Sequence, residues 1–160
     1  MKSTEHLVSL LLDKGLSIAA AESCTGGMFI SKLIDIPGTS GIIGASYITY
    51  SDEAKINTVG VSAETIKSFG VVSERTALEM AVGAMNTAKS DIGVGITGFA
   101  GPFEDDNDPD AGRVCFGFSV NGKTVTSEKR FGNIGRNAVR ELSCMYAADT
   151  LIRLIKTLGV

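Results

Sequence analysis

Two glycine-rich turns carry hydroxyl side chains that could do chemistry. The first is Glu22-Ser23-Cys24-Thr25-Gly26-Gly27, and the second is Thr97-Gly98-Phe99-Ala100-Gly101-Pro102. Free amide N–H groups at the start of a helix can hold a phosphate or stabilise a developing oxyanion, and glycine lets a ligand approach the backbone closely. Ser23 and Thr25 would place hydroxyl groups at such a site. The alternative is that Ser23 only caps a helix and Gly26 and Gly27 only shape the turn.

A serine nucleophile needs an activating base. The single histidine, His6, is remote in sequence from both turns, which argues against a Ser-His-Asp triad. A lysine whose pKa is lowered by burial can serve instead. Tyr50 and Lys55 flank a predicted strand-to-helix junction and would lie at the same sheet edge as Ser23 if that strand is parallel. Taken alone, Lys55 is more often a solvated helix lysine.

An acidic loop follows the second turn, from Glu104 to Asp110. Three of its aspartates alternate like the first ligands of a calcium loop: Asp106, Asp108 and Asp110. However, Pro109 interrupts the run, Ala111 stands where glycine is needed, and Gly117 stands where the bidentate glutamate belongs. A solvated surface loop is therefore favoured, and no metal is expected.

Three arginines are candidate anion contacts, although each could equally be a surface charge: Arg113, Arg136 and Arg140.

Helix-like and strand-like patterns alternate along the chain and would position these residues. The patterns predict helices over Thr4–Lys14, Gly27–Leu33 and Asn137–Leu158, strands over Ser17–Ala21, Ala45–Tyr50 and Asp91–Ile96, helix caps at Ser51, Ser62 and Ser73, and a hairpin about Asn121-Gly122. Together they predict an α/β fold, a three-layer α/β/α sandwich on a mixed sheet with a late β-hairpin.

The composition is that of a globular protein, with 44% hydrophobic and 21% charged residues. A net charge of −3 gives no basic field for nucleic acid. Three widely spread cysteines and one histidine offer no zinc or redox motif. No run resembles a signal peptide or a membrane span. We expect one cytoplasmic domain over residues 1–160, with no membrane or nucleic-acid partner.

Three segments occur here in the order of a known family: Ala21–Gly27, Tyr50-Ser51-Asp52-Glu53-Ala54-Lys55, and Thr97–Pro102. Together they resemble the C-terminal domain of the competence/damage-inducible CinA family, whose stand-alone members are nicotinamide-mononucleotide deamidases. The resemblance covers nearly the whole chain, and the three segments in register are specific. It implies an amidase that deamidates nicotinamide mononucleotide to nicotinic acid mononucleotide and ammonia, with no cofactor.

The resemblance also implies roles for individual residues. Ser23 inherits the role of nucleophile, with Lys55 as its base and Tyr50 as a catalytic partner. Substrate-binding residues are expected in the first and third segments, at Thr25, Gly26, Gly27, Thr97 and Gly98. The resemblance also implies an arginine near the start of the last helix that binds the nucleotide, which the local match assigns to Arg136, with Arg140 as the alternative. By family likeness we expect a small-molecule nucleotide substrate and self-association as a dimer.

This chain departs from the family pattern in the loop Phe103–Gly112, which is acidic and lacks the usual lysine-proline-valine-glycine ending. Glycine is also frequent in the family where Ala45-Ser46 stands. An acidic loop would repel a phosphate-bearing substrate unless it turns away or holds a cation. Two alternatives therefore stay open: an amidase for a different amide, and a non-catalytic nucleotide-binding or regulatory domain. Full-length relatives carry a further N-terminal domain with a separate hydrolase activity, which residues 1–160 are not expected to include.

Overall fold

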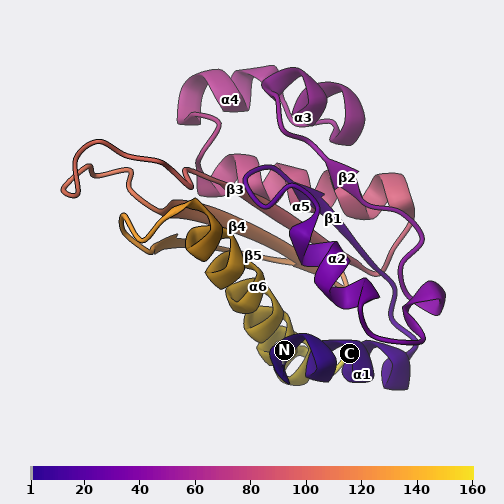
Figure 1. Ribbon diagram of the computed structural model, residues 1–160. Coiled ribbons are helices and arrows are strands. Elements are labelled where there is room, and N and C mark those ends of the chain that lie inside the picture. The colour runs from indigo at the N-terminus through magenta and orange to yellow at the C-terminus, as the bar shows by residue number, and fades with distance from the viewer. Residues whose placement is uncertain (1) are drawn as a thin grey trace.

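The computed structural model describes residues 2–160 and combines helices with a five-stranded sheet (Figure 1). The α-helices are α1 Lys2–Lys14, α2 Met28–Ile34, α3 Asp52–Val59, α4 Ala63–Phe69, α5 Glu74–Ala88 and α6 Arg136–Leu158. The strands are β1 Ile18–Glu22, β2 Tyr47–Ile48, β3 Ile92–Gly98, β4 Arg113–Val120 and β5 Lys123–Arg130. A short 3-10 helix spans Thr39–Gly41.

The sheet has the strand order β2-β1-β3-β4-β5 and is mixed. Strand β1 runs parallel to both of its neighbours, with Glu22 opposite Ile48 on β2 and Ile96 on β3. Strands β4 and β5 form an antiparallel hairpin next to β3. The carboxyl ends of β1, β2 and β3 therefore meet at one edge, which is where open α/β sheets usually bind ligands.

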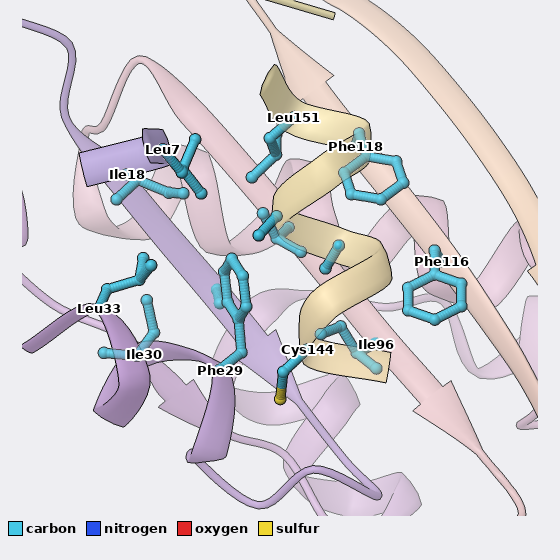
Figure 2. Close-up of a cluster of buried hydrophobic side chains, with 14 of the residues drawn as sticks. Leu7, Ile18, Phe29, Ile30, Leu33, Ile96, Phe116, Phe118, Cys144 and Leu151 are labelled. Carbon is cyan, nitrogen blue, oxygen red and sulfur yellow. The ribbon is translucent and has the colours of Figure 1, made fainter. Parts of the chain in front are cut away.

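Helices cover both faces of this sheet (Figure 1). Helices α1, α2 and α6 pack on one face, where the larger apolar cluster includes Phe29, Phe116 and Leu151 (Figure 2). Helix α5 lies on the other face, with α3 and α4 packed against it. The predicted α/β/α sandwich with a late hairpin is confirmed.

Glycines in β3 and β4 let α5 lie directly on the sheet. A Cβ atom added at Gly95 would stand 2.0 Å from the Ala77 carbonyl oxygen, and one at Gly93 would stand 2.1 Å from that of Ala81. Contacts this short are impossible for a real side chain. The close approach fixes the height of α5 above the sheet.

The predicted strand Ala45–Tyr50 is much shorter than expected. Only Tyr47 and Ile48 pair with β1. One residue earlier, the Ser46 hydroxyl accepts the hydrogen bond of the Ala20 N–H, at 2.7 Å. A side chain therefore satisfies the donor that a longer β2 ladder would have used.

The hydroxyls of Ser51 and Ser73 accept hydrogen bonds from the backbone N–H groups of Ala54 and Thr76, so both predicted caps are confirmed. Ser62 occupies the cap position of α4 without a side-chain bond, and its own N–H donates to Glu79 instead. In the part of the chain that the structure describes, every helix is too short or too polar to cross a membrane.

Candidate active site

A cavity of about 370 Å³ opens at the edge where the three parallel strands end. Its walls come from the first turn, the start of α3, the connection between α4 and α5, the second turn and the start of α6. The residues that line it are Ser23, Cys24, Tyr50, Asp52, Lys55, Val71, Val72, Thr97, Gly98, Phe99, Ala100, Gly101, Pro102, Phe103 and Arg136. Segments far apart in the sequence thus converge on Ser23.

Ser23 and Lys55 lie in direct contact within this cavity. Lys55 Nζ is 3.1 Å from Ser23 Oγ, and the Lys55 side chain is fully buried. Lys55 Nζ also donates to the carbonyl oxygens of Thr49 at 2.8 Å and Tyr50 at 3.4 Å. Burial lowers the pKa of Lys55, although the Asp52 carboxylate opposes this shift. The lysine is therefore no solvated helix residue, and the pair has the geometry of a nucleophile with its base.

The first turn is held from inside by Glu22, a buried carboxylate at the end of β1. Its Oε2 atom accepts hydrogen bonds from the N–H groups of Gly27 and Phe29, and its Oε1 atom accepts one from Ile30. Negative charge at the start of a helix is favourable. The N-terminal amides of α2 are therefore occupied by the protein itself.

Arg140 braces the outside of the same turn. Its Nε atom donates to the Cys24 carbonyl and its Nη2 atom to the Thr25 carbonyl, each at 3.0 Å. Gly26 and Gly27 have φ values of 58° and 90°, which favour glycine and make their presence a requirement of the turn.

The predicted substrate contacts Thr25, Gly26 and Gly27 do not line the cavity. Thr25 is fully buried, and its hydroxyl has no hydrogen-bond partner among the described residues. Their contact with substrate stays a prediction.

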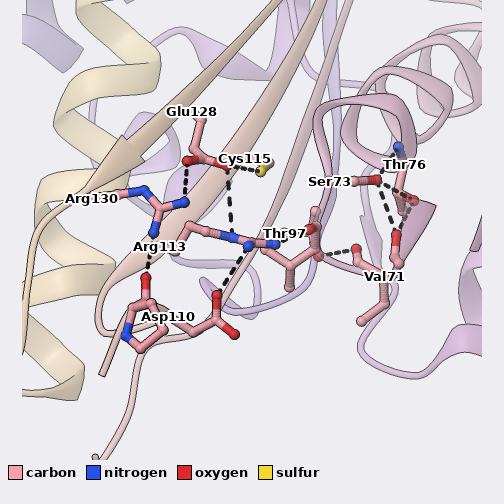
Figure 3. Close-up of polar contacts among 12 residues, drawn as sticks. Val71, Ser73, Thr76, Thr97, Asp110, Arg113, Cys115, Glu128 and Arg130 are labelled. Carbon is pink, nitrogen blue, oxygen red and sulfur yellow. Dashed lines mark hydrogen bonds and ion pairs between the residues drawn. The ribbon is translucent and has the colours of Figure 1, made fainter. Parts of the chain in front are cut away.

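The second turn, in contrast, lines the cavity along its whole length from Thr97 to Pro102. The Thr97 hydroxyl donates to the Val71 carbonyl at 3.0 Å, which ties this turn to the connection between α4 and α5 (Figure 3). Gly98 is required by packing, because an added Cβ would lie 2.7 Å from Val114 Cγ2. The peptide bond between Gly101 and Pro102 is cis.

Tyr50 and Arg136 meet at the exposed rim of the cavity. Arg136 Nη2 donates to the Tyr50 hydroxyl at 2.9 Å, and Arg136 Nη1 donates to the Gly101 carbonyl at 2.6 Å. The Tyr50 phenol therefore contacts Arg136, whereas Tyr50 contacts Lys55 through its backbone carbonyl. Of the two candidate arginines on α6, Arg136 lines the cavity and Arg140 does not.

Two other groups with nucleophilic or basic chemistry are poorly suited to a role here. Burial raises the pKa of the Cys24 thiol to about 12, so the thiol next to Ser23 stays protonated near neutral pH. His6 lies on α1, 3.3 Å from Lys156 near the end of α6. Helix α1 lies at the opposite end of the molecule from the start of α6, so the histidine is remote from Ser23 (Figure 1).

The acidic loop Phe103–Gly112 contributes only Phe103 to the cavity lining. Asp110 pairs with Arg113 at 3.0 Å, and Asp106 accepts a hydrogen bond from Asn133 at 2.7 Å. Across residues 2–160, His, Cys, Asp and Glu side chains form no group of three that could hold a metal ion. No carboxylate of this loop lines the cavity.

The sequence patterns missed several residues that build this site. Val71 and Val72 form part of the wall but belong to a connection with no recognisable motif. Glu22 is one of them, because the sequence motifs give it no role beyond its place in the first turn. Its position could have revealed this role, because a carboxylate that follows an apolar strand and precedes a helix is suited to accept hydrogen bonds from the first amides of that helix.

Comparison with known proteins shows which family this chain resembles. The family model described as the CinA C-terminal domain matches residues 1–155. A CinA-like protein of Kosmotoga olearia is 43% identical over 151 residues, which cover 94% of this chain and 36% of the relative. A putative competence-damage inducible protein of Alkaliphilus metalliredigens is 44% identical, covering 93% of this chain and 36% of the relative. The chain thus spans little more than a third of these curated relatives.

Two solved structures match over nearly their whole length. A CinA superfamily protein of Klebsiella pneumoniae 700603 superposes with a TM-score of 0.91 at 31% identity, covering 98% of this chain and 97% of that one. A competence/damage inducible protein of Agrobacterium tumefaciens superposes with a TM-score of 0.90 at 34% identity, covering 96% and 93%.

Proposed function

We propose that this chain, which belongs to the CinA C-terminal domain family, is an amidohydrolase that deamidates nicotinamide mononucleotide. The products would be nicotinic acid mononucleotide and ammonia. One observation carries the proposal: Lys55 Nζ lies 3.1 Å from Ser23 Oγ in a buried position that opens to a cavity.

The surroundings of Lys55 suit a neutral amine. Two of the three polar neighbours of Nζ are the carbonyl oxygens of Thr49 and Tyr50, which can only accept hydrogen bonds. A neutral amine has two N–H bonds and one lone pair. With both N–H bonds directed at the carbonyls, the lone pair faces the Ser23 hydroxyl and can accept its proton.

The reaction would then proceed in two halves. Ser23 Oγ attacks the carboxamide carbon while its proton passes to Lys55 Nζ. The tetrahedral intermediate collapses, the C–N bond breaks, and Lys55 returns the proton to the leaving nitrogen as ammonia. A water molecule then attacks the acyl-enzyme ester, and Lys55 accepts one of its protons. The bond from the acyl carbon to Ser23 Oγ breaks, Lys55 returns that proton to Ser23 Oγ, and the carboxylic acid product leaves and loses its remaining proton to solvent. Only protein groups, the substrate and water take part in this scheme.

The oxyanion would need donors other than the first amides of α2, because Glu22 occupies these. The backbone N–H of Cys24 directly follows the nucleophile and has no backbone acceptor among the described residues. It is our candidate for the oxyanion donor.

Substrate orientation would fall to the second turn and the rim. Arg136 offers a guanidinium at the exposed mouth, where a phosphate group could reach it. Phe99 offers an apolar ring and Thr97 a polar side chain among the residues that line the cavity. The acidic loop does not oppose this arrangement, since its carboxylates lie outside the lining.

The test is ammonia release from nicotinamide mononucleotide by the purified protein and its Ser23→Ala variant. The matched control is Ser31→Ala, which removes an exposed serine hydroxyl on α2, outside the cavity lining. We expect release by the wild type and the control and none by Ser23→Ala. Near-normal release by Ser23→Ala would refute the covalent mechanism. No release by the wild type, with the nucleotide still bound in calorimetry, would favour a regulatory nucleotide-binding domain.

A further inference from the structure

We infer that Arg113, which does not line the cavity, is a positioning residue that holds two of the cavity walls and thereby sets substrate affinity. The inference rests on the proposed function for its kinetic test. Arg113 opens strand β4, directly after the acidic loop.

The first wall is the connection between α4 and α5. Arg113 Nη2 donates to the carbonyl oxygen of Val72, and Val72 lines the cavity. The preceding carbonyl, that of Val71, accepts from the Thr97 hydroxyl. Two successive carbonyls of this wall are thus anchored to the sheet by side chains. Of these two anchors, only Thr97 belongs to the cavity.

The second wall is the ring of Phe99. The Arg113 guanidinium carbon lies 5.6 Å from the centre of this ring, within the range of a cation–π contact. The Phe99 N–H also donates to the Arg113 carbonyl at 2.8 Å. One residue therefore fixes the ring and the backbone of Phe99, and it does so while holding Val72.

Two carboxylates lie beside the guanidinium, whose Nε atom has no hydrogen-bond partner among the described residues. Asp110 Oδ1 lies 3.0 Å from Arg113 Nη1, and Glu128 Oε2 lies 3.7 Å from Arg113 Nε. The side chain is only 23% exposed. Asp110 and Glu128 offset the positive charge of Arg113 within the protein. We therefore assign Arg113 a positioning role instead of the anion contact that the sequence allowed.

A lysine at position 113 could not make all of these contacts. A planar guanidinium reaches a carbonyl, a carboxylate and an aromatic face at once, whereas a single ammonium reaches them only in turn. Arg130 provides a matched control, because it also pairs with Glu128, at 2.8 Å, and with the Pro109 carbonyl, but contacts no residue of the cavity lining.

The kinetic test compares Arg113→Ala and Arg113→Lys with Arg130→Ala. We expect Arg113→Ala to raise the KM for nicotinamide mononucleotide by about tenfold with kcat within about threefold of the wild type, since a loss of wall geometry costs binding. Arg113→Lys should raise KM by at least about threefold, and Arg130→Ala should leave KM within about twofold. Equal changes in KM for Arg113→Ala and Arg130→Ala, or an unchanged KM in Arg113→Ala, would overturn the inference.

A second measurement separates this inference from the proposed function. If the wild type releases no ammonia, the amidase proposal fails, and hydrogen exchange then decides on Arg113. Arg113→Ala should speed amide exchange in residues 70–73 at least about tenfold relative to Arg130→Ala, because the Val72 anchor is lost. Equal exchange of that segment in the two variants would refute the positioning role.

Discussion

The two glycine-rich turns are similar in sequence but differ in what their atoms face. In the first turn, Glu22 accepts the helix amides and Arg140 binds two carbonyls, so only Ser23 and Cys24 reach the cavity. In the second turn, every residue from Thr97 to Pro102 lines the cavity. The first turn is a frame that presents Ser23 to the cavity, and the second turn is a wall of the cavity.

The difference shows that glycine and hydroxyl residues alone do not identify a ligand-binding loop. Buried charges decide whether the polar backbone of a turn is free. A carboxylate at the end of β1 and an arginine one helical turn inside α6 satisfy the first turn from within the protein. In the second turn, Arg136 binds one carbonyl, that of Gly101.

The largest effect is expected from Lys55, the proposed base for Ser23. Lys55→Met keeps the buried aliphatic length but removes the amine, so kcat/KM for nicotinamide mononucleotide should fall by about 1,000-fold or more. Steady-state ammonia release measures the loss, and circular dichroism confirms that the variant is folded. Activity within tenfold of the wild type would mean that Ser23 is activated by another group.

The frame of the first turn should be costly to disturb. Glu22→Gln removes a charge that accepts three backbone hydrogen bonds and turns an acceptor into a donor. The free energy of unfolding should fall by about 3 kcal/mol, measured by urea denaturation. Glu53→Gln, at an exposed glutamate of α3, is the control and should change stability by less than about 0.5 kcal/mol. A loss no greater than that of the control would show that Glu22 does not hold the turn.

The two arginines of α6 should separate binding from catalysis. Arg136→Ala removes a rim cation and should raise KM by about tenfold with little change in kcat. Arg140→Ala releases the carbonyls behind Ser23 and should lower kcat by about tenfold with little change in KM. Initial-rate kinetics over a range of substrate concentrations distinguishes them. If both variants changed KM and kcat in the same way, the two turns would not differ in function as we propose.

The smallest effect is expected from the acidic loop. Asp105→Asn keeps an oxygen for the bond from the Asn107 N–H and removes one charge. Because Asp105 does not line the cavity, kcat/KM should change by less than about twofold at physiological ionic strength. A several-fold increase, lost at high salt, would mean that the loop charge does act on the substrate.

Much of the fold could be predicted from the sequence because local signals agree with the tertiary structure. Asn121-Gly122 marks the hairpin, and the hydroxyls of Ser51 and Ser73 cap their helices. The predicted strand Ala45–Tyr50 is longer than the observed β2 because the Ser46 hydroxyl, and not a backbone carbonyl, accepts the hydrogen bond of the Ala20 N–H. A pattern of β-branched and aromatic residues does not reveal such a substitution.

The site was less predictable because its walls depend on long-range contacts. Ser23 and Lys55 could be proposed from the family resemblance, and the structure brings them together. Arg136 and Arg140 are one helical turn apart on the same face, so spacing alone could not say which one reaches the cavity. The wall at Val72 is held by Arg113, 41 residues away in the sequence, and no local pattern predicts that contact.

The pH dependence of kcat/KM for nicotinamide mononucleotide tests the Ser23–Lys55 pair most directly. Burial lowers the pKa of Lys55 below its ordinary value of 10.5, and the proposed base acts only when it is neutral. The rate should therefore rise with pH through one ionisation whose midpoint lies below 10.5, and this ionisation should be missing from any residual activity of Lys55→Met. A rate that stays flat or falls as pH rises, or an ionisation that persists in Lys55→Met, would contradict the account.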